Sequence, residues 1–564
     1  MSESPKRIYG IDLGTTYSAI AFIDEYGKAQ IITNSDNERV TPSVVFFESE
    51  ENIVVGKIAK ESAQTDPGRV VDFVKRQMSD KDWTFEVDGK SYKPEEISAL
   101  ILKRLAGDAE KTGDHKVQDV VITCPAYFGD LERERTRTAG TLAGLNVIEI
   151  LDEPVAAAIN YGLNDDAKGK NVIVYDLGGG TFDVTVVKIG NDPDKNEISI
   201  VCTEGNHQLG GKDWDDRIVN HYVAEFQSQM GNSADILSDP EAAYEIRLHA
   251  ETDKKTLTNK ERAVRKVSYE GDKANVELHR EKFDELTEDL LEQTFALTDK
   301  VLEEAKARGI TKIHSFLLVG GSTRMKQIKE KVTARYGALL GITPVEFDVD
   351  EAVAKGAAKS GEIKVITSKV EAEISKIAGQ QGITDVTSLP DAIKDDITQQ
   401  AVTNVADAIG KQQDEIILVT KTKLKKVATK SYGIRALKNG QEVIRNLIVK
   451  QTPVPTEGSQ TFGTAGPNAD EIDLVVFTND ESEGDASPDM CLELGNAVFP
   501  LDGNLPAKAP IEITFKLDEQ GSLTLVGLDK THGKTITAQF KSDGVMSAEE
   551  IKAKSKELAI LEVE

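Results

Sequence analysis

The sequence predicts a chain of two folded parts, a long α/β part followed by an all-β sandwich. From residue 7 to about 361, apolar strand-like runs alternate with helical stretches such as 94–111, 213–230 and 282–308. From 432 to 540, short alternating strands are bounded by Gly, Asp, Asn or Pro, which is typical of an antiparallel sandwich. The length of 564 residues also exceeds what one hydrophobic core usually organises.

Two Gly-rich turns in the α/β part repeat the same chemistry. The segments 12–17 (D-L-G-T-T-Y) and 176–181 (D-L-G-G-G-T) each follow an apolar strand, present an Asp and a Thr, and lead into a second strand. Glycine lets backbone N–H groups approach an anion, Thr hydroxyls add donors, and Asp can hold a hydrated Mg²⁺. One such turn is as typical of an ordinary hairpin as of a phosphate site. Two related copies predict a pair of β-hairpins that grip the polyphosphate of a nucleotide.

These turns differ from the commoner phosphate loops, because the sequence has no G-x-x-x-x-G-K-[ST] and no G-x-G-x-x-G between a strand and a helix. They resemble the phosphate hairpins of the superfamily that includes actin, hexokinase and heat shock protein 70. The segments 11–18 and 178–184 are most similar to the heat shock protein 70 (DnaK-type) chaperones. Further motifs follow in that family's order, namely V-I-T-C-P-A-Y-F at 121–128, D-E-P-V-A-A-A at 152–158, L-G-G-K-D-W-D at 209–215, G-G-S-T-R at 320–324 and D-E-A-V-A at 350–354.

The resemblance implies a fold and an activity. It implies an α/β actin-like two-lobed ATPase domain at 1–361 and an all-β antiparallel sandwich that binds peptides at 427–545. The activity is a slow ATPase, converting ATP and water to ADP and phosphate, with Mg²⁺ as cofactor and K⁺ as an optional further ion. The function is that of an ATP-dependent molecular chaperone in protein folding and the stress response, with extended hydrophobic segments of client proteins as ligands. Because the family's long helical lid has no match beyond Leu558, the chain resembles an atypical, lid-less member.

Matching positions imply roles for individual residues. Asp12 and Asp176 hold Mg²⁺ through its waters, and Lys75 contacts the γ-phosphate and the attacking water. The acidic residues near that water are Glu153 and Asp183. The catalytic set is Lys75, Glu153, Asp176, Thr181 and Asp183. The set that binds nucleotide is Asp12, Gly14, Thr15, Thr16, Tyr17, Gly178, Gly179, Gly180, Gly210, Gly211, Glu251, Lys254, Lys255, Thr258, Gly320, Gly321, Ser322, Arg324 and Asp350.

Two further groups of residues follow from the same resemblance. Pro125 and Arg133 match positions that couple the nucleotide state to the second domain. Apolar residues of the sandwich match the family's peptide pocket, although alternate residues of a strand often simply fill a core. The pocket positions are Ile434, Leu437, Phe462, Ala465, Ile472 and Leu474. Besides client peptides, the implied partners are a J-domain co-chaperone and a nucleotide exchange factor. The J-domain docking patch is altered, since Glu149, Asp152 and Val155 stand where the family has arginine, asparagine and threonine.

The segments around the sandwich depart from the family. Residues 362–413 form an insertion with two helical apolar periodicities, which predicts a hairpin of helices packed on the ATPase lobe. The interdomain linker at 414–426 has the apolar run I-I-L-V at 416–419 and then lysines, which oppose its docking as an apolar strand. At 546–564, Ser547 and Glu550 form a capping box that begins a short C-terminal helix, read as a remnant of a lid.

Composition narrows the class of function. The formal net charge of −28 disfavours nucleic acid and anionic membrane surfaces as partners. The start of the chain does not resemble a signal peptide, and no apolar run reaches about 18 residues, so a cytoplasmic protein is expected. Cys124, Cys202 and Cys491 are far apart, which predicts buried thiols rather than disulfides or zinc ligands.

Two alternative functions stay open at this point. The first is a nucleotide-gated scaffold or co-chaperone that binds ATP with little hydrolysis and holds a dedicated partner. The second is a small-molecule kinase of the same superfamily, which the sandwich disfavours because a sugar kinase has no use for it. Single-turnover hydrolysis would separate the chaperone from the scaffold, and phosphate transfer to a sugar would favour the kinase.

Overall fold

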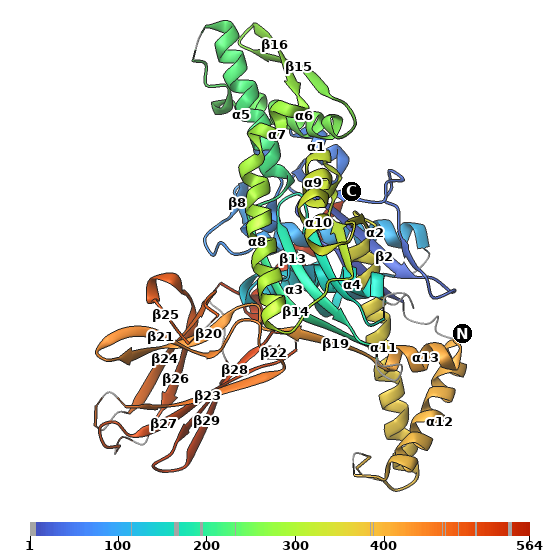
Figure 1. Cartoon of the computed structure of the whole chain (residues 1–564), viewed down its shortest axis with the longest axis vertical. Coiled ribbons are helices and arrows are strands. Elements are labelled where there is room, and N and C mark those ends of the chain that lie inside the picture. The colour runs from blue at the N-terminus through green and yellow to red at the C-terminus, as the bar shows by residue number, and fades with distance from the viewer. Residues whose placement is uncertain are drawn as a thin grey trace.

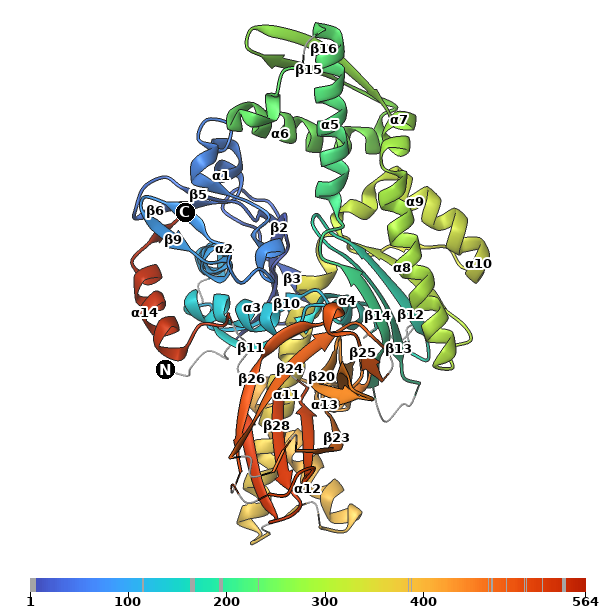
Figure 2. The same ribbon diagram turned by 90° about the vertical axis from the view of Figure 1, so that its left-hand side faces the viewer.

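The computed structural model describes residues 7–113, 116–162, 168–191, 196–231, 233–383, 385–386, 388–464, 466–467, 470–482, 484–501, 503, 505–519, 521–539 and 544–564. Its α/β part is built on two large sheets, and a pair of smaller sheets forms a separate β-sandwich (Figure 1). Figure 2 shows the two large sheets as two lobes that stand side by side, with the sandwich below them.

The first lobe is organised by a six-stranded sheet in the order β11-β10-β1-β2-β3, with β4 on β2. Strand alternation decides which helices cover each face. Tyr9 and Ile11 of β1 are buried in a core with α2 and α3, whereas Ile8 is buried in a core with α4 and α11. Its elements are β1 (Ile8–Asp12), β2 (Tyr17–Ile23), β3 (Ala29–Ile31), β4 (Thr41–Pro42), α2 (Pro94–Gly113), β10 (Asp119–Cys124), α3 (Asp130–Leu142), β11 (Asn146–Asp152) and α4 (Glu153–Gly162).

A smaller sheet, in the order β30-β6-β5-β7, sits on the first lobe. Its strand β30 comes from the C-terminal end of the chain and runs parallel to β6. The elements of this part are β5 (Val45–Phe47), β6 (Asn52–Val55), α1 (Lys57–Ser62), β7 (Val70–Val71), β8 (Phe85–Val87), β9 (Lys90–Tyr92) and β30 (Glu562–Val563).

The second lobe holds a seven-stranded sheet in the order β18-β17-β12-β13-β14-β19-β22. Strands β12 and β13 form the second predicted hairpin, in which Asp176 lies opposite Asp183, so both hairpins are confirmed. Its elements are β12 (Asn171–Leu177), β13 (Phe182–Ile189), β14 (Asn196–Asn206), α5 (Gly211–Met230), α6 (Pro240–Asn259), β15 (Arg262–Tyr269), β16 (Asp272–His279), α7 (Arg280–Leu286), α8 (Glu288–Ala307), β17 (Ser315–Val319), α9 (Lys326–Val332), α10 (Ala338–Leu340), β18 (Val345–Glu346), β19 (Thr422–Val427) and β22 (Pro453–Val454).

The helix predicted at 282–308 is two helices, α7 and α8, which meet at Thr287. The Thr287 hydroxyl donates to Phe283 O at 2.8 Å and lies 3.2 Å from Gln327 Oε1. A β-branched side chain that bonds to the preceding turn while its own backbone leaves the helical region explains the break.

The insertion begins as a continuation of the first lobe. Helix α11 (Ala352–Gln380) runs without interruption through the predicted boundary at residue 361. The helix continues through Gly361. A Cβ at this position would lie 2.4 Å from Ile8 Cγ2, so the absence of a side chain lets the helix pack closely on β1. The prediction that the insertion packs on the ATPase lobe is wrong. The far half of α11 forms its own apolar cluster with α12 (Asp391–Ile409) and α13 (Gln413–Thr420), and these helices project from the body in Figure 1.

The docked strand of the linker is the lysine-rich segment and not the apolar run. The run at 416–419 lies in α13, where Ile416 is buried in the helical cluster. Strand β19 follows almost at once and pairs in parallel with β14. Lys425 Nζ lies 2.9 Å from Glu197 Oε2, and Lys426 Nζ lies 2.8 Å from Glu149 Oε1. The expected opposition of the lysines is therefore wrong, because acidic residues of both lobes neutralise them.

The Lys426–Glu149 ion pair is buried, with 11% and 4% of the two side chains exposed. Burial opposes charge on both groups, but their attraction raises the pKa of Lys426 and lowers the pKa of Glu149. Lys364 Nζ is also 3.3 Å from Glu149. Glu149 is thus held by the linker in this arrangement.

The sandwich consists of sheets in the orders β25-β21-β20-β24-β26 and β23-β27-β28-β29. Alternate residues of facing strands, such as Val476 and Phe515, fill the core between the sheets. Its strands are β20 (Ser431–Lys438), β21 (Gln441–Ile448), β23 (Thr456–Gly463), β24 (Glu471–Asn479), β25 (Asp485–Ala486), β26 (Leu492–Pro500), β27 (Pro510–Leu517), β28 (Leu523–Asp529) and β29 (Lys534–Gln539).

The C-terminal helix α14 (Ala548–Ala559) begins at the predicted capping box, with Ser547 as its N-cap. The reading as a lid remnant would place it on the sandwich, but it packs on the first lobe instead. Leu558 and Leu561 are buried in the core of that lobe, and Lys103 Nζ donates to their carbonyls at 2.7 and 3.1 Å. After the helix, β30 adds a parallel strand to β6, with Val563 opposite Ile53.

The sandwich contacts both lobes. Lys450 Nζ lies 3.2 Å from both carboxylate oxygens of Glu204 in the second lobe. Tyr432 Oη donates to Asp130 Oδ1 of the first lobe at 3.0 Å. Burial raises the pKa of Asp130 to about 7, although Tyr432 and Arg133 act in the opposite direction. The ionised form of Asp130 is therefore disfavoured while the sandwich is docked.

The contact between Tyr432 and Asp130 predicts that docking of the sandwich depends on pH. A carboxyl whose pKa is near 7 when docked and near 3.8 when exposed stabilises docking at low pH and loses that contribution as the pH rises from about 4 to about 7. Asp130→Asn, which imitates the protonated carboxyl, is expected to raise the melting temperature more at pH 7.5 than at pH 5.5. The neighbouring charged groups Glu132, Arg133 and Asp518 stay unchanged in that comparison. An equal shift at both pH values would contradict it.

Candidate nucleotide site

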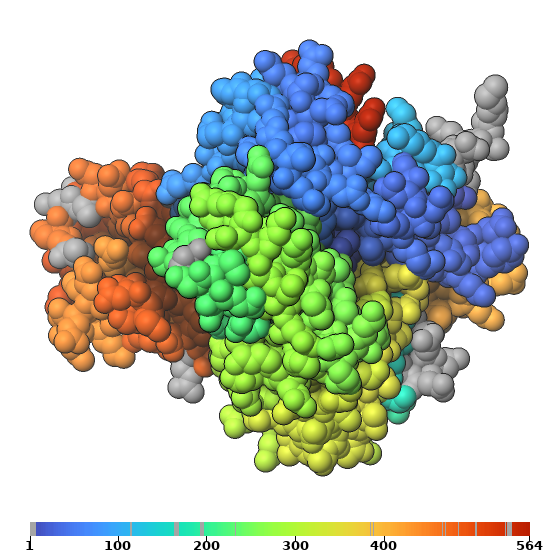
Figure 3. Space-filling model, turned by 90° about the horizontal axis from the view of Figure 1, so that it is seen from above, coloured from blue at the N-terminus to red at the C-terminus, as the bar shows by residue number. Residues whose placement is uncertain are grey.

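A cavity of about 550 Å³ lies between the two lobes. Figure 3 looks down on the end of the molecule where the lobes meet. Most of the residues predicted to bind nucleotide line this cavity, and they come from both lobes. They are Asp12, Gly14, Thr15, Thr16, Tyr17, Lys75, Glu153, Asp176, Gly178, Gly179, Thr181, Glu251, Lys254, Lys255, Thr258, Gly320, Gly321, Ser322, Arg324 and Asp350.

Four predicted residues lie just behind the described lining. Gly180 packs on Thr15, where a Cβ would approach Thr15 Cγ2 to 2.3 Å. Gly210 N donates to Asp213 Oδ2 at 2.7 Å at the start of α5, and Gly211 O accepts from Lys254 Nζ at 2.7 Å. Asp183 is buried and accepts from Ala126 N at 3.1 Å. These residues support the lining rather than forming it.

The two hairpins meet at the bottom of the cavity. A Cβ on Gly179 would come within 2.0 Å of Thr16 Oγ1, so only glycine allows the two turns to approach this closely. Gly178 N donates to Thr181 O at 3.0 Å, and Ser322 Oγ donates to Gly178 O at 2.8 Å. The buried Thr15 hydroxyl has no hydrogen-bond partner within the described chain. An unsatisfied buried donor beside glycine turns is what a phosphate oxygen would satisfy.

Charged groups gather beside the hairpins. Lys75 Nζ donates to Glu153 Oε1 at 2.6 Å, and only 6% and 9% of these side chains are exposed. Burial raises the pKa of Asp12 to about 7, with Glu153 adding to the effect. Burial and Glu153 also raise the pKa of Asp176 and of Asp183 well above the ordinary value. A cluster of carboxylates whose ionisation is this costly fits a cation between them.

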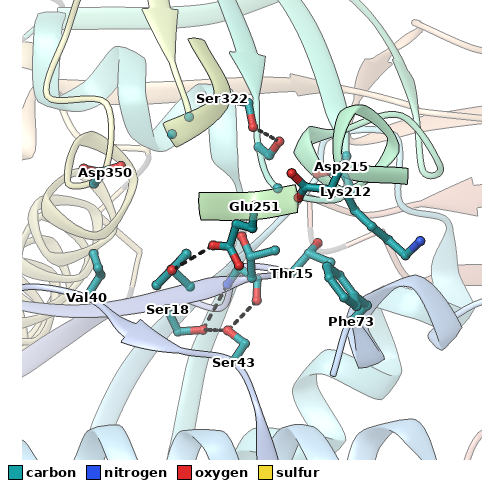
Figure 4. Close-up of a pocket in the computed structure, with 18 of the residues that line it drawn as sticks. Thr15, Ser18, Val40, Ser43, Phe73, Lys212, Asp215, Glu251, Ser322 and Asp350 are labelled. Atoms are coloured by element: carbon teal, nitrogen blue, oxygen red, sulfur yellow. Dashed lines mark hydrogen bonds between the residues drawn. The ribbon is translucent and has the colours of Figure 1, made fainter. Parts of the chain in front are cut away.

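The opposite end of the cavity carries a polar network that spans the lobes. Tyr17 Oη donates to Glu251 Oε1 at 3.1 Å, and Lys255 Nζ donates to the same oxygen at 2.7 Å. Lys60 of α1 also pairs with Glu251, and the two lysines, Lys60 and Lys255, lower the pKa of Glu251 to about 2 against the effect of burial. Figure 4 shows Glu251 among the residues that line the cavity. Lys60 was not predicted, because nothing in its local sequence points to the site.

Four predicted positions, Arg324, Asp350, Thr258 and Lys254, have defined partners. Arg324 pairs with Asp350, so its guanidinium is engaged at the rim. Thr258 Oγ1 donates to Lys254 O at 3.4 Å, and Lys254 Nζ lies 2.7 Å from Asp215 Oδ2. Asp215 also lines the cavity, and its presence in the motif at 209–215 is the signal that could have identified it.

The predicted coupling residues lie between the cavity and the sandwich. Arg133 Nε donates to Phe128 O at 2.9 Å, and another guanidinium nitrogen donates to Ala126 O at 3.1 Å. Phe128 N donates back to Pro125 O, which closes the turn. Arg133 also lies 2.6 Å from Asp152 Oδ1. Since Ala126 N binds Asp183, a continuous set of hydrogen bonds joins the cavity to the start of α3.

The predicted pocket residues of the sandwich divide into two groups. Ile434 and Leu474 are buried in the sandwich core, and Phe462 and Ile472 pack against the same cluster. Leu437 lies outside that cluster, with 73% of its surface exposed. Ala465 is outside the described residues. The first four side chains are thus brought together, and Leu437 is not.

The comparison with known families agrees with this arrangement. The family model described as Hsp70 protein matches residues 8–87, 77–417 and 398–562. Members of this family are ATPases that bind ATP with Mg²⁺ and act as chaperones on client peptides together with co-chaperones. Among the described residues, no helix is long and apolar enough to cross a membrane. The matched segments span nearly the whole sequence, and the chain therefore belongs to the Hsp70 family.

Proposed function

We propose that this chain is an ATP-dependent chaperone, in which an actin-like two-lobed ATPase domain controls a sandwich that binds extended hydrophobic peptides. The observation that carries the proposal is the cavity of about 550 Å³ in which both hairpins meet. Thr15 supports this reading, because it lines the cavity and its buried hydroxyl lacks a partner within the described chain.

The residues fit ATP and Mg²⁺. The phosphates would lie on the turns that contain Thr15, Thr16, Gly178 and Gly179, and the adenosine would lie toward Glu251, Lys255, Thr258 and Ser322. Bound Mg²⁺ neutralises charge on the phosphate oxygens. Asp12 and Asp176 would accept hydrogen bonds from its water ligands.

The proposed roles of the remaining residues follow from their position. Lys75 would hold the transferred phosphate and orient the attacking water, and Glu153 fixes the lysine by a 2.6 Å hydrogen bond. Asp183 and Thr181 would position that water from the second hairpin. In the sandwich, the half-buried Phe462 and Ile472 would take an apolar side chain of a peptide.

Saturating ATP with Mg²⁺ is expected to raise the melting temperature of the full chain. Binding to the folded state alone adds RT ln(1 + [L]/Kd), or about 2.7 kcal/mol at a hundredfold excess over Kd. Differential scanning calorimetry with ATP and Mg²⁺, and with ATP and EDTA, measures the effect. The same samples, followed for phosphate release with and without a Leu-rich peptide, test hydrolysis. No thermal shift would contradict the proposal, and a shift without phosphate release would favour the scaffold.

A further inference from the structure

We propose that Arg76 is a positioning residue of the ATPase site, which fixes the Lys75 segment of the first lobe to the phosphate turn of the second lobe. The inference rests on the proposed ATPase function. Arg76 does not belong to the described lining of the cavity, so it would act on the reaction through the groups that it holds and without touching the nucleotide.

The Arg76 guanidinium crosses from one lobe to the other. Its Nε donates to Gly180 O at 2.8 Å, and its two terminal nitrogens lie 3.2 and 2.5 Å from the two carboxylate oxygens of Asp213. Only 11% of the Arg76 side chain is exposed. A planar guanidinium that donates three hydrogen bonds in a fixed fork fixes both a distance and an orientation, which a lysine cannot do.

Both attachment points in the second lobe lie directly behind the phosphate turn that lines the cavity. Gly180 is the last glycine of the second hairpin, between Gly179 and Thr181. Asp213 lies in the first turn of α5, where its Oδ2 also accepts from Gly210 N at 2.7 Å. Lys212 N donates to Gly179 O at 2.8 Å, so the start of α5 and the hairpin are already joined. Arg76 therefore binds to the two elements that shape this side of the cavity.

On the first lobe, Arg76 lies in the short 3₁₀ turn Val74–Gln77 that also carries Lys75. The residue before this turn, Phe73, has φ of 52° and ψ of 23°, a left-handed conformation that is costly for a bulky side chain. Lys212 Nζ lies 5.6 Å from the centre of the Phe73 ring, a second contact across the lobes. A strained backbone persists where surrounding contacts hold it, and Arg76 supplies the strongest of these contacts to the second lobe.

Two consecutive residues, Lys75 and Arg76, thus fix the turn to both lobes. Lys75 is bound to Glu153 of the first lobe, and Arg76 is bound to Gly180 and Asp213 of the second. Lys75 must meet a phosphate that the second hairpin holds, so its reach depends on the separation of the two lobes at this point. Misplacement of a catalytic group by about 1 Å costs on the order of a hundredfold in rate.

Arg76→Ala is expected to lower the single-turnover rate constant of ATP hydrolysis by roughly tenfold or more, with a change in the ATP dissociation constant of less than about threefold. The matched control is Arg69→Ala. Arg69 donates its Nε to Phe47 O at 2.5 Å and two terminal nitrogens to Asp88 at 2.6 and 2.5 Å, but all these partners lie in the first lobe. Hydrolysis in the control should match that of the unmodified chain.

A double-variant cycle with Asp213→Asn sharpens the test. If Arg76 acts through Asp213 and Gly180, the two losses in hydrolysis rate overlap, and the double variant is little slower than Arg76→Ala. Three outcomes would each overturn the inference. The first is a hydrolysis rate in Arg76→Ala within twofold of the unmodified chain. The others are a loss of rate explained wholly by weaker ATP binding, and an equal loss of rate in Arg69→Ala. An unmodified chain that binds ATP without hydrolysing it would contradict the proposed ATPase, and the inference would fall with it.

Discussion

Lys75→Met is expected to remove nearly all ATP hydrolysis and to destabilise the folded chain by about 3–5 kcal/mol. The stability loss follows because Lys75 and Glu153 form a buried pair, and removing one partner leaves an uncompensated charge. The loss of activity follows because no other described side chain is placed to bring a positive charge to the bottom of the cavity between Asp12 and Glu153. Urea unfolding and single-turnover phosphate release measure the two effects.

The double variant Lys75→Met/Glu153→Gln separates the effect on stability from the effect on hydrolysis. Removing both charges relieves the unpaired carboxylate, so most of the lost stability should return while hydrolysis stays absent. Lys282→Met is the control for loss of an ion pair in general, since Lys282 and Glu285 form an exposed pair that contributes little. Recovery of hydrolysis in the double variant would remove Lys75 from the proposed mechanism.

Leu558→Ala is expected to destabilise the first lobe by about 2–5 kcal/mol. Leu558 is 2% exposed and lies in the main core of that lobe, so the truncation removes buried apolar contacts and leaves a cavity. Ile560→Ala, two residues along the same segment, is the control because Ile560 is 73% exposed. Chemical denaturation of the two variants compares them directly.

The comparison of Leu558→Ala with Ile560→Ala tests whether the whole C-terminal segment is part of the first lobe. If α14 is part of the first lobe, the loss appears in the unfolding of that lobe and in faster hydrogen exchange of β6, which pairs with β30. A Leu558→Ala variant as stable as Ile560→Ala would mean that the helix is only loosely attached in solution.

Local sequence was sufficient wherever the structure depends on neighbours in the chain. Each hairpin is set by a strand, a Gly-rich turn and a returning strand that follow one another directly in the sequence, and both are predicted. The start of α14 was predicted for the same reason, since Ser547 and Glu550 satisfy each other's backbone groups three residues apart.

The errors arose where distant residues decide the outcome. The lysines of β19 oppose docking only if their partners are ignored, and Glu149 lies 277 residues away from Lys426 in the sequence. The apolar stripe of the insertion was assigned to the ATPase lobe because α13 was read as linker, whereas Ile416 completes the insertion's own core. Arg76 and Lys60 were missed because a charged residue on a short helical segment is ordinarily solvated, and only the facing lobe gives it a partner.

The two ends of the sandwich are attached to different lobes, and this closes the molecule into a ring. At one end, β19 extends the sheet of the second lobe. At the other end, α14 and β30 belong to the first lobe. The lobes are therefore linked through the sandwich as well as through the chain segments that pass directly between them. A movement of the lobes that widens the cavity would separate the two attachments of the sandwich. The strand pairing at β19 and the buried leucines of α14 both resist such a movement. A cut between the sandwich and α14 would open the ring while leaving every residue of the cavity in place.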